Sequence, residues 1–123
     1  MDTVALIETA TALARPFAPS AEVSAGTVAA ALLTAAGTIY TGVCVDTRCS
    51  LGFCAEHAAV AEMLKAHQAE VRMLVVVTST GQILAPCGRC RELLLQVSPA
   101  NRSAWVILSP TTGRLLGDLL PER

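Results

Sequence analysis

The sequence has few aromatic residues and no marked excess of charge of either sign. Aromatic residues make up 3% of the 123 positions, and the formal net charge is −1 at pH 7. Proteins that bind nucleic acid usually carry a basic stripe and aromatic side chains on which bases stack. The composition therefore argues against a polynucleotide partner.

Long hydrophobic runs are also lacking, although hydrophobic residues make up 53% of the sequence. No apolar run approaches the roughly 20 residues that a helix needs to span a bilayer. The first residues, Met1-Asp2-Thr3, place no basic segment ahead of an apolar stretch, so we expect neither a secretory signal nor a membrane span. Much of the hydrophobic content is alanine, which fits either a core of small residues or a surface partly buried against other subunits. Both interpretations stay open.

The cysteines do not fit a disulfide framework. There are five of them, an odd number, and three fall in a pattern typical of metal ligands. Free thiols of this kind favour a reducing, cytoplasmic setting over an oxidising one.

The length and the order of the patterns predict a single α/β domain over residues 1–123. The apolar and β-branched periodicities alternate between helical and extended segments, which is typical of a three-layer α/β/α sandwich with one mixed five-stranded sheet. The expected elements are helices over residues 3–15, 54–69 and from 87 or 88 up to Pro99, and strands over 27–34, 38–46, 71–78, 104–109 and 113–117.

Cysteine and glutamate recur at the spacing of a zinc site. Cys54-Ala55-Glu56 is followed by Pro86-Cys87-Gly88-Arg89-Cys90, and Cys-x-Glu followed by Pro-Cys-x-x-Cys is the signature of zinc-dependent base deaminases. A structural zinc site is normally closed by a fourth protein ligand, whereas a catalytic site keeps one position open. The residue two along from Cys54 is the carboxylate Glu56 rather than a further Cys or His, so we interpret Cys54, Cys87 and Cys90 as the ligands of one Zn²⁺ in an open site.

Glu56 is the candidate catalytic residue of this site. A carboxylate two residues from a zinc ligand can take a proton from the activated water and deliver protons to a ring nitrogen and to departing ammonia. We therefore predict a zinc-dependent hydrolase that converts the exocyclic amine of a cytosine-type or related amino-heterocycle to the oxo form. The main-chain carbonyl of Ala55 or Pro86 could accept a hydrogen bond from that amine.

Both halves of the motif fall where helices are predicted to begin. The free N–H groups and the positive end of the helix dipole there favour thiolates over thiols. Three thiolates oppose the lowering of the pKa of a bound water, so a nearby cation or donor has to offset their charge. His57, Arg89 and Arg91 are the candidates.

Two rival functions use the same residues. Cys87 and Cys90 alone would suit a dithiol redox protein, but Cys54-Ala55-Glu56 would then have no role. A zinc-bound scaffold or binding module without turnover is the other alternative, and the intact Glu56 argues against it.

In this order of elements, these residues resemble the small homotetrameric cytidine deaminases and the related blasticidin-S deaminases. Residues 28–34, 37–43 and 83–95 carry the resemblance, which extends over nearly the whole chain. It implies the same sandwich fold, one Zn²⁺ per chain, Glu56 as proton shuttle, a homotetramer, and a free nucleoside or nucleoside-like compound as the substrate. In many members an arginine follows the glutamate, whereas this chain has His57, which could donate to a sulfur.

The departures from the resemblance concern the substrate. Cytidine deaminases usually carry Asn-x-Glu at the end of the second strand, where it holds the ribose hydroxyls, and here Cys44-Val45-Asp46 occupies that place. A Phe that lies against the pyrimidine corresponds to Gly26. We expect cytidine to be a poor substrate for this reason. The substrate-binding candidates are Cys44, Asp46, Arg48, Phe53 and Ala55, with a buried position as the alternative for Cys44 and an exposed one for Arg48.

Overall fold

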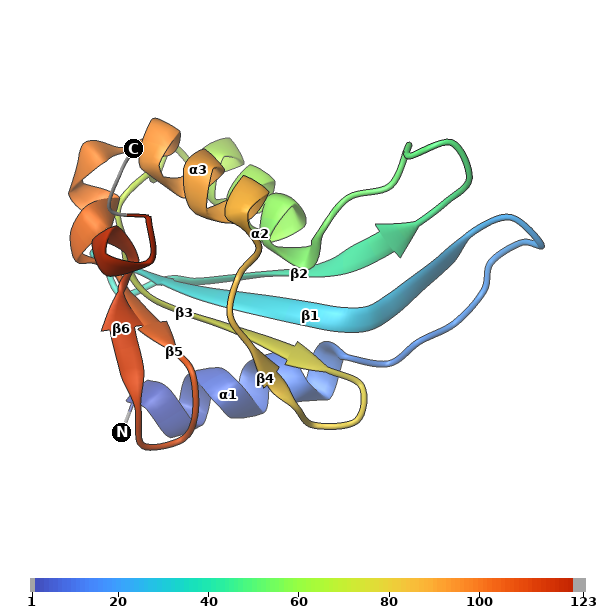
Figure 1. Ribbon diagram of the computed structural model, residues 1–123, viewed down its shortest axis with the longest axis horizontal. Coiled ribbons are helices and arrows are strands. Elements are labelled where there is room, and N and C mark those ends of the chain that lie inside the picture. The colour runs from blue at the N-terminus through green and yellow to red at the C-terminus, as the bar shows by residue number, and fades with distance from the viewer. Residues whose placement is uncertain (1, 121–123) are drawn as a thin grey trace.

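The computed structural model describes residues 2–120 of the chain (Figure 1). Residue 1 and residues 121–123, which belong to the predicted domain, lie outside the described residues. The elements in chain order are α1 (Asp2–Leu13), β1 (Ser24–Thr34), β2 (Ile39–Asp46), α2 (Ala55–Lys65), β3 (Val71–Thr78), β4 (Ile83–Leu84), α3 (Gly88–Val97), the 3₁₀ helix η1 (Pro99–Ser103), β5 (Trp105–Ile107), β6 (Gly113–Leu115) and the 3₁₀ helix η2 (Leu116–Leu119).

One mixed sheet forms the middle layer, as predicted. Its strands lie in the order β2-β1-β3-β5-β6, and the β3–β5 pair is parallel whereas the other pairs are antiparallel. The sheet has six strands rather than the predicted five, because β4 pairs with β3 outside this order. A two-residue strand is too short to produce an alternating pattern in the sequence, which explains why the prediction missed it.

Helices cover both faces of the sheet, with α1 on one side and α2 and α3 on the other (Figure 1). The central strand β1 supplies both cores, since successive side chains of a strand point to opposite faces. Ala29, Ala31 and Leu33 pack in the core that includes α1, and Ala30 and Leu32 pack in the core that includes α2 and α3. The three-layer α/β/α prediction is confirmed.

The predicted helix over 54–69 ends earlier than expected. It stops at Lys65, and His67 adopts a left-handed conformation with φ of 62°. Left-handed residues commonly close helices, but a histidine in that role leaves no clear sequence signal. No helix within residues 2–120 combines the length and apolar character that a membrane crossing needs.

Gly42 lets α2 approach β2 very closely. A Cβ atom placed on Gly42 would lie 2.5 Å from the Ala58 Cβ, 2.5 Å from the Ala59 N and 2.6 Å from the Ala55 O. Two of these three atoms belong to the helix backbone, which cannot move without shifting the helix. The position of α2, and of the residues at its start, therefore depends on the absence of a side chain at Gly42.

We expect Gly42→Ala to destabilise the fold by about 1–3 kcal/mol, the usual cost of overpacking a close contact. Denaturant unfolding followed by circular dichroism measures the change. Gly88→Ala is the matched control, because a Cβ there meets nothing within 4 Å. Equal stabilities for the two variants would contradict the role given to Gly42.

Candidate metal centre and active-site pocket

Two helix starts carry the three cysteines of the motif. Cys54 is the N-cap residue of α2 and Cys87 is the N-cap residue of α3, and both have extended backbone conformations. Cys90 follows in the first turn of α3 and is fully buried. The prediction that both halves of the motif lie at helix N-termini is confirmed.

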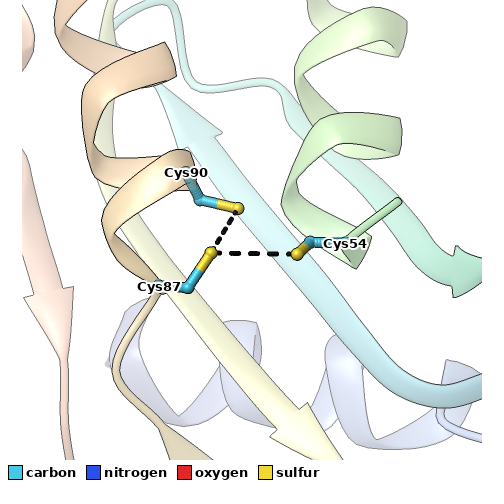
Figure 2. A group of neighbouring side chains, drawn as sticks. All are labelled: Cys54, Cys87 and Cys90. Carbon is cyan, nitrogen blue, oxygen red and sulfur yellow. Dashed lines mark hydrogen bonds between the residues drawn. The ribbon is translucent and has the colours of Figure 1, made fainter. Parts of the chain in front are cut away.

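The three sulfur atoms converge on one point between the two helices (Figure 2). The Cys54 and Cys87 Sγ atoms are 3.8 Å apart, and the Cys87 and Cys90 Sγ atoms are 3.4 Å apart. All three lie within 4.8 Å of one another. A tetrahedral zinc ion with Zn–S bonds of about 2.3 Å separates its sulfur ligands by ~3.8 Å. The three thiols therefore fit a zinc ion, with one corner of the tetrahedron left without a protein ligand.

The environment of these thiols opposes their ionising together. Burial raises the pKa of Cys90, and the charge of Glu56 adds to this effect. Burial also raises the pKa of Cys54, and the hydrogen bond to Cys87 contributes. At Cys87 burial acts in the same direction, but hydrogen bonds from the Cys90 backbone and the neighbouring thiols outweigh it and lower the pKa. A cation among the sulfurs reverses this balance, so metal binding displaces protons here.

Glu56 is buried in the first turn of α2, two residues after Cys54, with 4% of its surface exposed. Among residues 2–120, no hydrogen bond to its carboxylate is found. It lines the same pocket as Cys54 and Cys87. A buried carboxylate without a protein partner beside a metal-binding group can accept and donate protons within the pocket.

His57 lies close to one sulfur, and Arg89 lines the pocket beside Cys54 and Cys87. The Nδ1 atom of His57 is 3.6 Å from the Cys90 Sγ. Burial lowers the pKa of His57, and the positive charge of Arg89 lowers it further. The neutral ring can donate its Nδ1–H to the sulfur in the tautomer that carries the proton there, and the role of His57 as a donor stays a prediction.

Arg91 connects two chain segments near the site. Its Nε donates to the Pro86 carbonyl at 2.7 Å, and its Nη1 donates to the Leu119 carbonyl at 2.9 Å. Neither bond reaches a sulfur. Arg91 therefore joins the start of α3 to η2, and the Pro86 carbonyl already accepts one hydrogen bond from it.

A pocket of about 500 Å³ opens beside the three cysteines, a volume within the usual range for small-molecule sites. Its wall contains four of the five predicted substrate-binding residues, namely Cys44, Asp46, Phe53 and Ala55. The fifth, Arg48, is absent from the wall. It forms an exposed ion pair with Glu22, with an N···O distance of 3.8 Å.

The structure adds Thr27 to the pocket, a residue that the sequence analysis did not consider. Its hydroxyl lies 3.1 Å from the Cys44 Sγ and 3.4 Å from the Asp46 Oδ2. The only signal in the sequence was the position of Thr27 next to Gly26, where the resemblance places a wall residue. Cys44 is buried, with 6% of its surface exposed, and it still lines the pocket.

We expect Ala substitution of Cys54, Cys87 or Cys90 to abolish stoichiometric zinc binding, and Cys44→Ala and Cys49→Ala to preserve it. The reason is that only the first three sulfurs converge, and an open site needs each of its three ligands. Metal analysis of the purified variants measures the effect, with about one zinc per chain expected in the unmodified protein. Loss of zinc in Cys49→Ala, or its retention in Cys90→Ala, would contradict this ligand set.

Comparison with known proteins relates most of the chain to one family. Residues 4–106 match the family model described as the cytidine and deoxycytidylate deaminase zinc-binding region. The chain is 38% identical over 96 residues to a cytidine deaminase of Mycobacterium tuberculosis (strain ATCC 25618 / H37Rv), covering 77% of this chain and 70% of the relative. It is 29% identical over 93 residues to a cytidine deaminase of Halalkalibacterium halodurans, covering 75% of this chain and 66% of that protein.

Solved structures show the same architecture. The crystal structure of cytidine deaminase from Mycobacterium tuberculosis aligns with a TM-score of 0.82 and 33% identity, covering 99% of this chain and 96% of that one. Cytidine deaminase from Mycobacterium leprae aligns with a TM-score of 0.82 and 25% identity, covering 99% of both chains. The family model spans Glu56 and all three converging cysteines, and so the chain belongs to the cytidine and deoxycytidylate deaminase family.

Proposed function

We propose that the protein is a zinc-dependent hydrolytic deaminase in which Cys54, Cys87 and Cys90 hold the metal and Glu56 moves the protons. The observation that carries this proposal is the buried Glu56 carboxylate, which lines one pocket together with Cys54 and Cys87. A metal site that only stabilises the fold needs neither an open position nor a carboxylate in a pocket. A dithiol redox function would leave the third thiol, Cys54, without a role.

A zinc ion held by Cys54, Cys87 and Cys90 would lower the pKa of a water molecule in the pocket. Glu56 would accept a proton from water as its oxygen adds to the carbon that carries the amine, and would deliver protons to the ring nitrogen and to the leaving amine, so that ammonia departs and the oxo product remains. His57 and the helix N-termini at Cys54 and Cys87 moderate the charge of the sulfurs. The Ala55 backbone lies in the pocket wall beside Glu56 and is a candidate acceptor for the amine.

We expect Glu56→Gln to retain zinc and the fold while lowering kcat by about 10²–10⁴-fold, because it removes the proton shuttle but no ligand. Ammonia release measures turnover, and metal analysis measures zinc. Glu62→Gln is the matched control on the same helix, since Glu62 is exposed and its carboxylate accepts a hydrogen bond from the Thr41 backbone N–H. Turnover in Glu56→Gln equal to that of the control would show that another group handles the protons.

The substrate that we propose is a free cytosine nucleoside or a nucleoside-like amino-heterocycle. The relatives are named cytidine deaminases, and a pocket of about 500 Å³ suits a nucleoside. The wall near the expected sugar position nevertheless carries Cys44 and Asp46 rather than an amide and a glutamate. The Cys44 thiol is a weak hydrogen-bond donor compared with an amide.

We therefore expect a low catalytic efficiency for cytidine. A site without strong paired hydrogen bonds to the hydroxyls discriminates weakly in favour of ribose, and no aromatic side chain stands at Gly26. The expected kcat/KM for cytidine is below roughly 10⁵ M⁻¹s⁻¹. Assays of ammonia release with cytidine, deoxycytidine, cytosine and blasticidin S measure the preference. A kcat/KM for cytidine above that limit would contradict the expected weak binding of the sugar hydroxyls. It would not affect the deaminase assignment.

We further propose a single-domain protein that assembles as a homotetramer in the cytoplasm. Several large hydrophobic side chains are exposed, among them Phe17 and Leu51 at 62% and 79%, and burial against other subunits would remove them from water. All five cysteines are free, which supports a reducing compartment. Neither a nucleic acid polymer nor a membrane is among the proposed partners.

A further inference from the structure

The pocket wall formed by β1 and β2 contains an irregularity that decides which side chain faces the substrate. Ala25 pairs with Val45 and Ala29 pairs with Val43, so three residues of β1 lie opposite the single residue Cys44. Such a bulge re-aims side chains at the place where it occurs. Here it places Thr27 and Val28 in the pocket wall.

Gly26 maintains this bulge and excludes a side chain of its own. It has a left-handed φ of 86°, and a Cβ atom there would lie 2.5 Å from the Arg15 carbonyl oxygen. An aromatic wall residue at this position is therefore incompatible with the path of residues 15 and 16. Thr27 is the neighbouring residue that reaches the pocket instead.

Thr27, Cys44 and Asp46 form a polar corner whose hydrogen bonds can all run in one direction. The Cys44 Sγ is 3.1 Å from the Thr27 Oγ1, and the Thr27 Oγ1 donates to the Asp46 Oδ2 at 3.4 Å. If the thiol donates to the hydroxyl and the hydroxyl donates to the carboxylate, each proton is used once. The Cys44 Sγ also lies 3.8 Å from the same Oδ2. These contacts to the carboxylate both involve Oδ2, and no hydrogen bond to the Asp46 Oδ1 is found among residues 2–120.

We propose that Thr27 is a specificity-determining residue of the deaminase, which orients Asp46 so that its carboxylate accepts a hydrogen bond from a hydroxyl of the substrate. This inference rests on the proposed function and names the group that the corner recognises. An ionised carboxylate only accepts, and the Thr27 hydroxyl donates to its Oδ2. The corner therefore selects substituents that donate, such as sugar hydroxyls, over alkyl groups.

The negative charge of Asp46 also favours substituents that donate hydrogen bonds. Arg48, two residues beyond Asp46, has its ion pair with Glu22 and does not line the pocket. Hydrogen bonds to a charged partner are stronger than neutral ones, so this single contact supplies part of the discrimination that a fully paired site would give. Asp46 therefore acts as the acceptor of the corner, and Thr27 acts through it as a positioning residue.

The test compares cytidine with 1-methylcytosine, which carries the same heterocycle without hydroxyls. The measured quantity is the ratio of their kcat/KM values in Thr27→Val, which keeps the shape of the side chain but removes its hydroxyl. We expect this ratio to fall about tenfold, mainly through a higher KM for cytidine, which corresponds to about 1.4 kcal/mol. Thr27→Ser should restore most of the ratio. Thr9→Val, an exposed hydroxyl deletion on α1 at the other face of the sheet, is the matched control.

A double-mutant cycle tests the coupling to Asp46. Asp46→Ala should lower the ratio at least as much as Thr27→Val, and the double variant should show no further fall, because one interaction is removed in both cases. Zinc content and thermal unfolding verify that each variant is intact. An unchanged ratio in Thr27→Val, or effects of the two substitutions that add, would overturn the inference while leaving deamination in place. Failure of the unmodified, zinc-loaded protein to release ammonia from either compound would overturn the proposed function and, with it, this inference.

Discussion

The close packing of α2 on β2 is the constraint on which the site depends. Gly42 has no side chain, and Ala55, Ala58 and Ala59 on the facing side of the helix are small, so the two backbones come into direct contact. A larger residue at any of these positions would move the start of α2 away from the sheet. Cys54 and Glu56 are carried by that first turn, and their distances to Cys87 and Cys90 follow from where the helix rests.

The metal centre illustrates how the fold and the ligand chemistry depend on each other. Two helix N-termini bring three sulfurs together, and burial raises the pKa of Cys54 and Cys90. The same convergence that suits a tetrahedral cation is therefore electrostatically unfavourable for three thiolates without one. The helix dipoles and the His57 Nδ1, 3.6 Å from the Cys90 Sγ, reduce this cost in the metal-bound state.

The corner of the pocket between β1 and β2 is built from features that depend on one another. The bulge in β1 requires a left-handed glycine, the glycine excludes an aromatic wall, and the next residue turns its hydroxyl toward Cys44 and Asp46. These features belong together, since Thr27 reaches Asp46 only while the bulge is in place.

The sequence by itself determined the fold class, the metal ligands to be expected and the identity of the carboxylate beside them. Those inferences rest on local periodicity and on short spacings, which survive in any arrangement of the elements. Only the tertiary structure decided that Thr27 belongs to the pocket, that Arg48 faces Glu22 instead, and that Arg91 joins Pro86 to Leu119. Each of these depends on a contact between segments distant in sequence, and such contacts arise from a bulge, a loop path or a helix position that leaves no periodic signal. The six-strand sheet escaped prediction for the same reason, because β4 is identified as a strand only by its pairing with β3.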